Sequence, residues 1–131
     1  MDVTPPPKAD RMADITVNAA YGSVVEDEGM LFVGFAAGED EEEGYVLFRQ
    51  PLAGGPVWFE VNDESFGAED AVDHVASGGK GIEITLRPGL AAIFGWAGTV
   101  AVRIGPDCED AAQALDALQQ MLGDRWQAAK T

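Results

Sequence analysis

KGIEITLRPGLAAIFGWAGTVAVRIG, residues 80–105, has the clearest secondary-structure pattern in the sequence. Apolar and polar residues alternate over residues 82–86, which is typical of a strand with one buried face and one exposed face. Pro88 ends that pattern and suits the first turn of a helix, so we predict a short helix over residues 90–94. A second β-branched run follows at residues 99–104. The stretch therefore predicts a strand, a short helix and a second strand.

The residues before this segment predict further strands of the same sheet. One of them, VWFEV at residues 57–61, turns Val57, Phe59 and Val61 to the core and places Trp58 and Glu60 on the other face. We expect loops at the acidic segment 38–44 and at NDESFGAED, residues 62–70. The predicted strands cover residues 14–21, 29–35, 45–50, 57–61, 71–76, 82–86 and 99–104.

The end of the chain predicts a helix that covers this sheet. Asp107 can cap it, Glu109 and Asp110 suit its first turn, and Gly123 suits the position just past its end. Its apolar residues share one helical face: Ala111, Leu115, Leu118 and Leu122. We therefore predict an α+β fold, a single curved, mostly antiparallel sheet of about six to seven strands with a short connecting helix and a C-terminal helix packed on one face.

Length and composition set limits on the class of protein. The chain has 131 residues, and we expect a flexible tail at 1–11 and one domain at 12–131. Cys108 is the only cysteine, so no disulfide framework is expected and the cytoplasm is the predicted location. No uncharged stretch is long enough to predict a membrane span. We expect no cofactor.

The charge is the most unusual property of the sequence. The formal net charge is −15, and fourteen acidic residues against one basic residue, Arg49, lie between Glu26 and Asp73. Phosphate backbones are bound by clustered Lys and Arg, so direct nucleic-acid binding is not expected. A basic protein partner fits this charge, and so does a role in solubility alone.

Few residues here suggest chemistry. The acidic loop can be a docking surface or a solvated hairpin tip. The carboxylates around NDESFGAED do not have the spacing of a calcium loop, so no metal site is predicted. His74 has Asp73 beside it, but neighbours on a strand point to opposite faces. Cys108 near a helix N-terminus is read as inert, and Trp58 as either packed under a second layer or facing a partner.

The chain resembles the immunity protein 10 family of bacterial polymorphic-toxin systems. The similarity runs over residues 45–122 and is carried by YVLFRQ, VWFEV with its NDESFG loop, and the hairpin into GIEITLRPGLAAIFG. Residues 86–95 are the best match. The resemblance implies a non-enzymatic immunity protein that neutralises a cognate toxin domain by stoichiometric binding.

The expected partner is thus a toxin domain, and the charge of this chain predicts that the domain is basic. We expect no membrane partner, and we expect the chain itself to be a monomer or homodimer. The residues predicted to bind that partner are exposed acids and one aromatic residue: Glu39, Asp40, Glu41, Glu42, Glu43, Trp58, Asp63, Glu64, Glu69 and Asp70. The alternative is a small ligand-binding or enzymatic domain with a pocket between sheet and helix.

Overall fold

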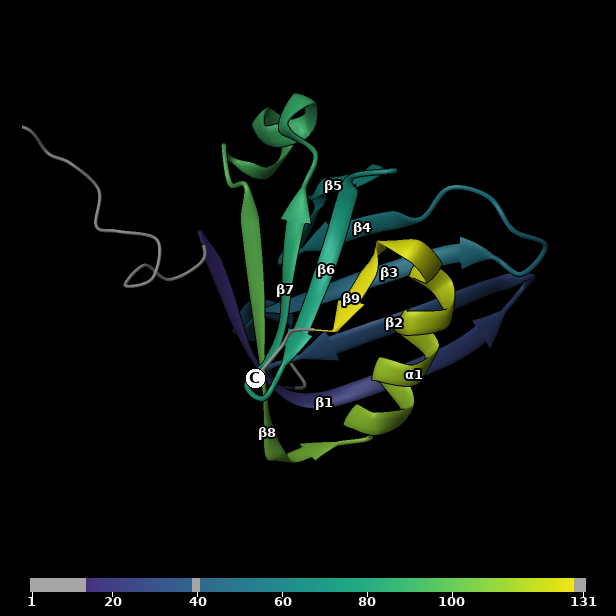
Figure 1. The fold of residues 1–131 in the computed structure, drawn as a ribbon, viewed down its shortest axis with the longest axis vertical. Coiled ribbons are helices and arrows are strands. Elements are labelled where there is room, and N and C mark those ends of the chain that lie inside the picture. The colour runs from purple at the N-terminus through teal and green to yellow at the C-terminus, as the bar shows by residue number, and fades with distance from the viewer. Residues whose placement is uncertain (1–13, 39–40, 129–131) are drawn as a thin grey trace, which may run out of the picture.

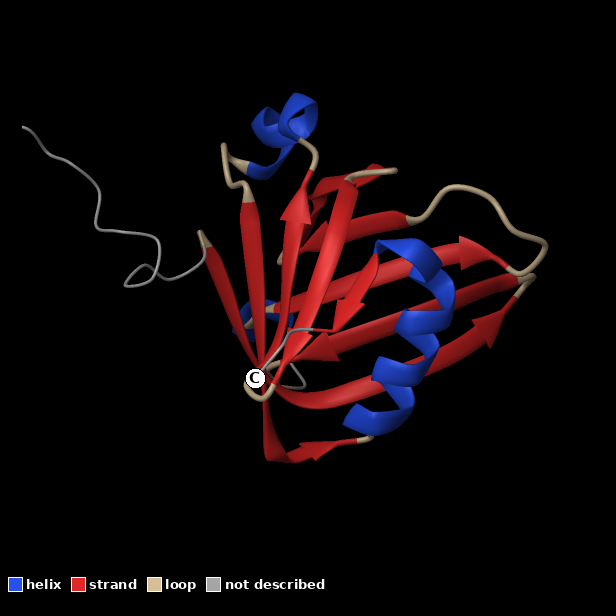
Figure 2. Ribbon diagram, viewed as in Figure 1, coloured by secondary structure: helices blue, strands red, loops and turns tan. Residues whose placement is uncertain are grey.

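The structure is a computed structural model, and it describes residues 14–38 and 41–128. Strands make up most of it, with one long helix and three short 3₁₀ helices among the described residues (Figure 2). In chain order the elements are β1 (Ile15–Asp27), β2 (Met30–Ala36), η2 (Glu41–Glu43), β3 (Tyr45–Pro51), β4 (Trp58–Val61), β5 (Asp63–Glu69), β6 (Val72–Gly78), β7 (Gly81–Leu86), η3 (Pro88–Phe94), β8 (Thr99–Glu109), α1 (Ala111–Leu122), η4 (Gly123–Arg125) and β9 (Trp126–Ala128).

The strands of the described residues form one nine-stranded sheet in the order β5-β4-β3-β2-β1-β8-β7-β6-β9. The predicted α+β fold with a single sheet is confirmed. The predicted count of six to seven strands is too low, because residues 63–69 form β5 in place of the predicted loop and the three-residue β9 has no clear strand pattern in the sequence. Two pairs of strands are parallel, β1 with β8 and β6 with β9. The sequence pattern predicts a mostly antiparallel sheet and does not identify these two parallel pairs.

Strand β1 joins the two halves of the sheet. Its first part, Ile15 to Ala19, pairs in parallel with β8, and its second part, Tyr21 to Asp27, pairs antiparallel with β2. The register with β8 shifts between Ala19 and Tyr21, where the strand changes partner. In Figure 1, β6, β7 and β8 accordingly run steeply up the picture while β2 and β3 run across it.

The core fills the space inside the curled sheet. Its largest fully buried side chains include Phe35, Phe48, Phe59 and Phe94. The Phe59 ring of β4 lies 4.9 Å from the Phe48 ring and 5.9 Å from the Phe94 ring of η3. Because η3 follows β7, the last contact brings the two halves of the sheet together around one core.

Helix α1 packs across β1 and β2 on the core side of the sheet. Ala114, Leu118 and Leu122 are its buried residues, while Leu115 is partly buried. A Cβ at Gly22 of β1 would lie 3.0 Å from the Cβ of Ala114, so the helix lies very close to that strand. None of the helices in the described part of the chain has the length and hydropathy required to cross a bilayer.

The predicted start of this helix is wrong and its predicted end is confirmed. Strand β8 continues through Asp107 to Glu109, because Glu109 still pairs with Tyr21 of β1. Asp110 then takes a left-handed backbone (φ 59°) at the N-cap and makes no side-chain cap, and the first turn holds no acidic residue. Gly123 ends the helix with φ 56°.

The predicted loop at residues 62–70 is also wrong, because it contains β5. Asn62 (φ 66°) and Asp70 (φ 58°) take left-handed backbones on either side of the strand, a conformation that Asn and Asp tolerate. Between them β5 pairs with β4, with Glu60 opposite Gly67. Backbone pairing with a neighbouring strand thus outweighs the low strand propensity of DESFGAE.

Candidate partner-binding surface

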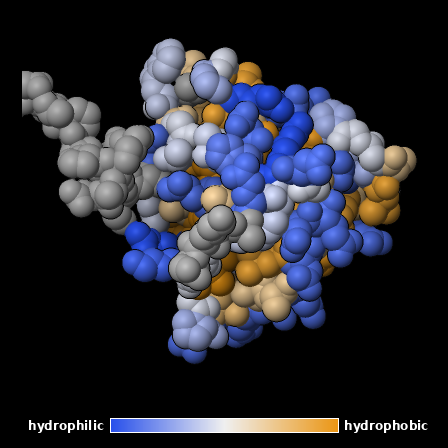
Figure 3. All heavy atoms as spheres, in the orientation of Figure 1, coloured by the Kyte–Doolittle hydropathy of each residue, from blue (hydrophilic) through white to orange (hydrophobic). Residues whose placement is uncertain are grey.

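The outer face of strands β1 to β5, which we define as the face turned away from α1, carries the candidate site. The strand register places Ser23, Gly34, Leu47 and Glu60 in one row across this face. The contacts agree, since a Cβ at Gly34 would lie 3.3 Å from Ser23 Oγ and 3.7 Å from Leu47 Cδ1. Figure 3 shows the other side, with α1, where hydrophilic residues cover much of the surface.

Glu60 is a nearly buried carboxylate on this face, with 6% of its surface exposed. Tyr45 Oη donates a hydrogen bond to Glu60 Oε2, and Trp58 Nε1 donates one to Glu60 Oε1 at 2.8 Å. Both donors are neutral. Among the described residues, no Lys or Arg side chain forms an ion pair with Glu60. We call Tyr45, Trp58 and Glu60 the Glu60 network.

Trp58 is held in place on this face by its neighbours on β3 and β5. The Arg49 guanidinium lies 4.6 Å from the centre of the Trp58 ring, a cation–π arrangement. On the other side a Cβ at Gly67 would lie 2.5 Å from Trp58 Cζ2, so only a glycine leaves room for the indole there. The sequence pattern correctly places Trp58 and Glu60 on one face, and the indole is half-buried there.

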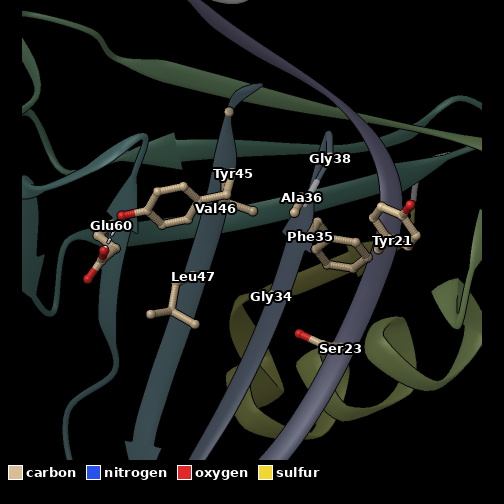
Figure 4. A pocket seen from close by; sticks show the side chains of 11 residues that line it. Tyr21, Ser23, Gly34, Phe35, Ala36, Gly38, Tyr45, Val46, Leu47 and Glu60 are labelled. Atoms are coloured by element: carbon tan, nitrogen blue, oxygen red, sulfur yellow. Dashed lines mark hydrogen bonds between the residues drawn. The ribbon is translucent and has the colours of Figure 1, made fainter. Parts of the chain in front are cut away.

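A hollow of about 300 Å³ lies beside the Glu60 network. Figure 4 shows Tyr21 and Ser23 on β1 along one side and Tyr45 and Leu47 on β3 along the other, with the Tyr45 ring directed toward Glu60. Small residues of β2 lie between those two strands. The residues that line the hollow are Tyr21, Ser23, Gly34, Phe35, Ala36, Gly38, Gly44, Tyr45, Val46, Leu47 and Glu60.

The structure brings the acidic loop and the start of β5 to the same end of the sheet. Tyr45 N–H donates to Asn62 Oδ1 at 3.0 Å, and Asn62 N–H donates to Tyr45 O at 3.0 Å. These two bonds join the residue after η2 and Gly44 to the residue before β5. We call Glu42, Glu43, Asp63 and Glu64, which are all exposed, the acidic end.

The acidic end reaches the rim of the hollow. The Glu43 carboxylate lies against Gly38, which lines the hollow, since a Cβ at Gly38 would be 2.4 Å from Glu43 Cδ. Asp63 Oδ1 accepts hydrogen bonds from the N–H and the hydroxyl of Ser65, both at 2.8 Å. The Ser65 backbone bond, followed by the hydroxyl bond, lowers the pKa of Asp63 below its ordinary value, so it carries its charge at neutral pH.

The other predicted residues do not join this group. Glu39 and Asp40 lie outside the described residues, and Glu41 is the first residue of η2. Glu69 is exposed at the last position of β5, opposite Trp58, and Asp70 follows it. Their partners on β4, Val61 for Asp63 and Trp58 for Glu69, are three strand steps apart, which is about 10 Å at the usual rise per residue. The structure therefore divides the predicted residues between the two ends of β5.

Asp70 has partners within the chain. Its Oδ1 lies 2.9 Å from Arg125 Nη2 and 3.3 Å from Arg87 Nη2, and Arg87 Nε donates to the Asp70 carbonyl at 2.8 Å. The hydrogen bond from Arg125 is the largest cause that lowers the pKa of Asp70 below its ordinary value. The cluster connects the end of β5 with the segments before η3 and at η4.

The side chain of His74 has a different arrangement from the one expected. His74 Nδ1 lies 2.7 Å from Asp73 Oδ2, although neighbours on a strand were expected to point apart. The β6–β7 register shifts between Val72 and His74, and that irregularity lets the two side chains meet.

Cys108 lies in β8, where burial is the main cause that raises its pKa, followed by the charges of Asp110 and Glu109. The raised pKa disfavours the thiolate. Within the described residues, no group of three or more His, Cys, Asp or Glu side chains could hold a metal ion.

Sequence reasoning missed the roles of Tyr45 and Glu60. The sequence did contain a signal for Glu60, because it is an acidic residue inside VWFEV on the same strand face as a tryptophan. A strand residue next to such a bulky neighbour loses contact with water.

The space between α1 and the sheet is where the alternative function predicts a pocket. It holds the buried side chains of Ala114, Leu118 and Leu122. The hollow lies on the opposite face.

The chain was compared with family models, curated proteins and solved structures, and it matches none of them.

Proposed function

We propose that this chain is an immunity protein that binds a cognate bacterial toxin domain one-to-one in the cytoplasm and blocks it without catalysing a reaction. The observation that carries the proposal is the placement of the acidic end beside the hollow and the Glu60 network. A charged rim around a partly apolar, aromatic centre is the usual composition of a protein–protein interface. The resemblance over residues 45–122 supports the same class of function.

The charge of the chain favours a basic toxin domain as the partner. A net charge of −15 attracts a basic surface over a distance of about one Debye length, roughly 8 Å at physiological salt. A toxin that cleaves or modifies nucleic acid has a basic cleft for the phosphate backbone. Carboxylates at the acidic end can occupy such a cleft in place of phosphates, which would block access to the substrate.

The first test asks whether the neighbouring reading frame encodes a toxin domain and uses that domain as the binding partner. We expect this chain to co-purify with that domain at one-to-one stoichiometry and to abolish its activity at equimolar concentration. Isothermal titration calorimetry gives the stoichiometry, and a toxin activity assay gives the inhibition. A toxin that stays fully active beside an excess of this chain contradicts the proposal.

The second test asks whether the acidic end steers association. A variant with Glu42→Gln, Glu43→Gln, Asp63→Asn and Glu64→Gln should associate about tenfold more slowly at low salt and show a flatter salt dependence. Stopped-flow fluorescence measures the rate constant. The matched control removes four exposed acids elsewhere: Glu83→Gln, Asp107→Asn, Asp116→Asn and Asp124→Asn. Equal rate constants for the two variants would exclude the acidic end as the docking site.

A further inference from the structure

We propose that the hollow on the outer face binds an arginine side chain of the partner, with the Glu60 carboxylate as the acceptor. This inference rests on the proposed function, because an arginine of a basic toxin domain is the expected source of the guanidinium. It goes further by naming the residues that receive the group, which the overall charge of the chain does not identify.

The first argument is that the Glu60 carboxylate has acceptor positions without a donor from the described chain. Glu60 has 6% of its surface exposed, and the two hydrogen-bond donors to its carboxylate, Tyr45 Oη and Trp58 Nε1, are neutral. An ionised carboxylate offers about four acceptor positions, so roughly two remain. Burial of a carboxylate without a cation is costly, and a guanidinium that arrives with a partner removes that cost.

The second argument is that no cation of the described chain takes this position. Arg49 is the nearest basic residue by strand register, and its guanidinium lies over the Trp58 ring. Arg87 and Arg125 bind Asp70 beyond the far end of β5. The position beside Glu60 is therefore left to a group from outside the described chain.

The third argument is the shape and chemistry of the hollow. Gly34 and Ala36 leave open space between β1 and β3, so the methylene stem of an arginine can lie over them and against Leu47. The guanidinium can then stack on the Tyr45 ring while it donates to Glu60. Glu43 at the rim adds a second negative charge to the entrance.

The experiment titrates the full chain with N-acetyl-arginine amide, followed by ¹H–¹⁵N nuclear magnetic resonance. The reporter is the Trp58 indole N–H, because Trp58 Nε1 donates to the proposed acceptor. We expect a saturable shift of this resonance with the arginine compound and none with N-acetyl-citrulline amide, which has nearly the same shape without the charge. Equal shifts with both compounds, or no saturable shift with either, would overturn the inference.

A pair of variants tests the acceptor. Glu60→Gln should weaken arginine binding at least about tenfold, since a charge-assisted bond becomes a neutral one. Asp116→Asn removes the same charge from the exposed side of α1 and should leave binding unchanged. Unchanged binding in Glu60→Gln overturns the assignment. Circular dichroism checks that both variants fold, and the comparison of arginine with citrulline on the unaltered chain stands without them.

These outcomes separate the inference from the proposed function. If the chain inhibits the toxin domain and the hollow ignores the arginine compound, the proposed function stands and the inference fails. If the hollow binds the arginine compound but no toxin domain is inhibited, the proposed function fails. The site then remains as a guanidinium site whose natural source is a different molecule.

Discussion

Glu60 on β4 and Asp70 just after β5 lie close in sequence, and their carboxylates have opposite surroundings. Glu60 is nearly buried and has two neutral hydrogen-bond donors. Asp70 is exposed and has two arginines bound to one of its oxygens. The exposed acid is thus occupied by its own chain, whereas the buried acid lacks a cation among the described residues. Exposure alone is therefore a poor guide to which acid is available to a partner.

The two carboxylates also connect different parts of the fold. The Glu60 network joins β3 and β4 within the outer face. The Asp70 cluster joins the end of β5 to Arg87 before η3 and to Arg125 in η4. Asp70 stays a predicted partner-binding residue, but its geometry describes a closure between segments far apart in sequence.

Removal of the Glu60 carboxylate should have the largest effect on stability. Glu60→Ala removes the hydrogen bonds from Tyr45 Oη and Trp58 Nε1 and opens a cavity, so we expect a loss of about 3 kcal/mol in the free energy of unfolding. Urea denaturation measures it. Glu60→Gln keeps an acceptor oxygen and should lose less than about 1 kcal/mol. Glu83→Ala, an exposed strand acid, should stay within about 0.5 kcal/mol. A loss in Glu60→Ala no larger than in Glu83→Ala would show that the network is not structural.

Crowding the indole that supports Glu60 should have the next largest effect. A Cβ at Gly67 would lie 2.5 Å from Trp58 Cζ2 and 2.8 Å from Glu60 Cβ, so Gly67→Ala forces the ring away from its acceptor. We expect a loss of about 2 kcal/mol, measured by urea denaturation. Gly79→Ala is the matched control, because nothing lies within 4 Å of its Cβ position. Similar losses in the two variants would contradict the close fit of Trp58 over Gly67.

Loss of a single donor to Glu60 should have a smaller effect. Trp58→Phe keeps an aromatic ring under Arg49 but removes the Nε1 hydrogen bond, so we expect a loss of about 1 kcal/mol. Differential scanning fluorimetry with urea titration measures it. Trp96→Phe, at a tryptophan that is 78% exposed, serves as the control and should change little. No difference between the two would mean that Tyr45 alone supports Glu60.

The smallest expected effect is the acid dependence of the Asp70 cluster. The pKa of Asp70 is lowered from 3.8, first by the Arg125 hydrogen bond, so its stabilising contribution is complete above about pH 4 and is lost as the pH falls through the lowered value. The stability difference between the unaltered chain and Asp70→Asn should stay constant from neutral pH down to about pH 5. It should shrink below about pH 4, and urea denaturation at several pH values follows it. A difference that stays constant into that acid range would indicate that Arg87 and Arg125 do not favour the charged form.

Much of the fold follows from local patterns in the sequence. Alternation over residues 82–86 and 99–104 predicts β7 and most of β8, and Gly123 marks the end of α1. Strand β5 does not follow from such patterns, because DESFGAE forms a strand only through its pairing with β4. Parallel pairing of β1 with β8 depends on the whole topology, and no short pattern encodes it.

The candidate site follows from the sequence only in part. Charge counting finds the acids, and the two-residue period places Trp58 and Glu60 on one face. It does not show that Asn62 joins the acidic loop to β5 through Tyr45, or that Arg87 and Arg125 meet at Asp70. Those contacts link residues that are 17 to 55 positions apart, and they exist only after the sheet has formed.

The change of partner within β1 has a consequence for biosynthesis. As the chain leaves the ribosome, the second part of β1 can form a hairpin with β2 almost at once, because the two are adjacent in sequence. The first part has to wait for β8, since Ile15 pairs with Val100, 85 residues later. Long-range parallel pairing is slow to form. The nascent protein therefore presents an unpaired apolar strand segment until β8 has left the ribosome, and that interval is when a chaperone would be most useful to it.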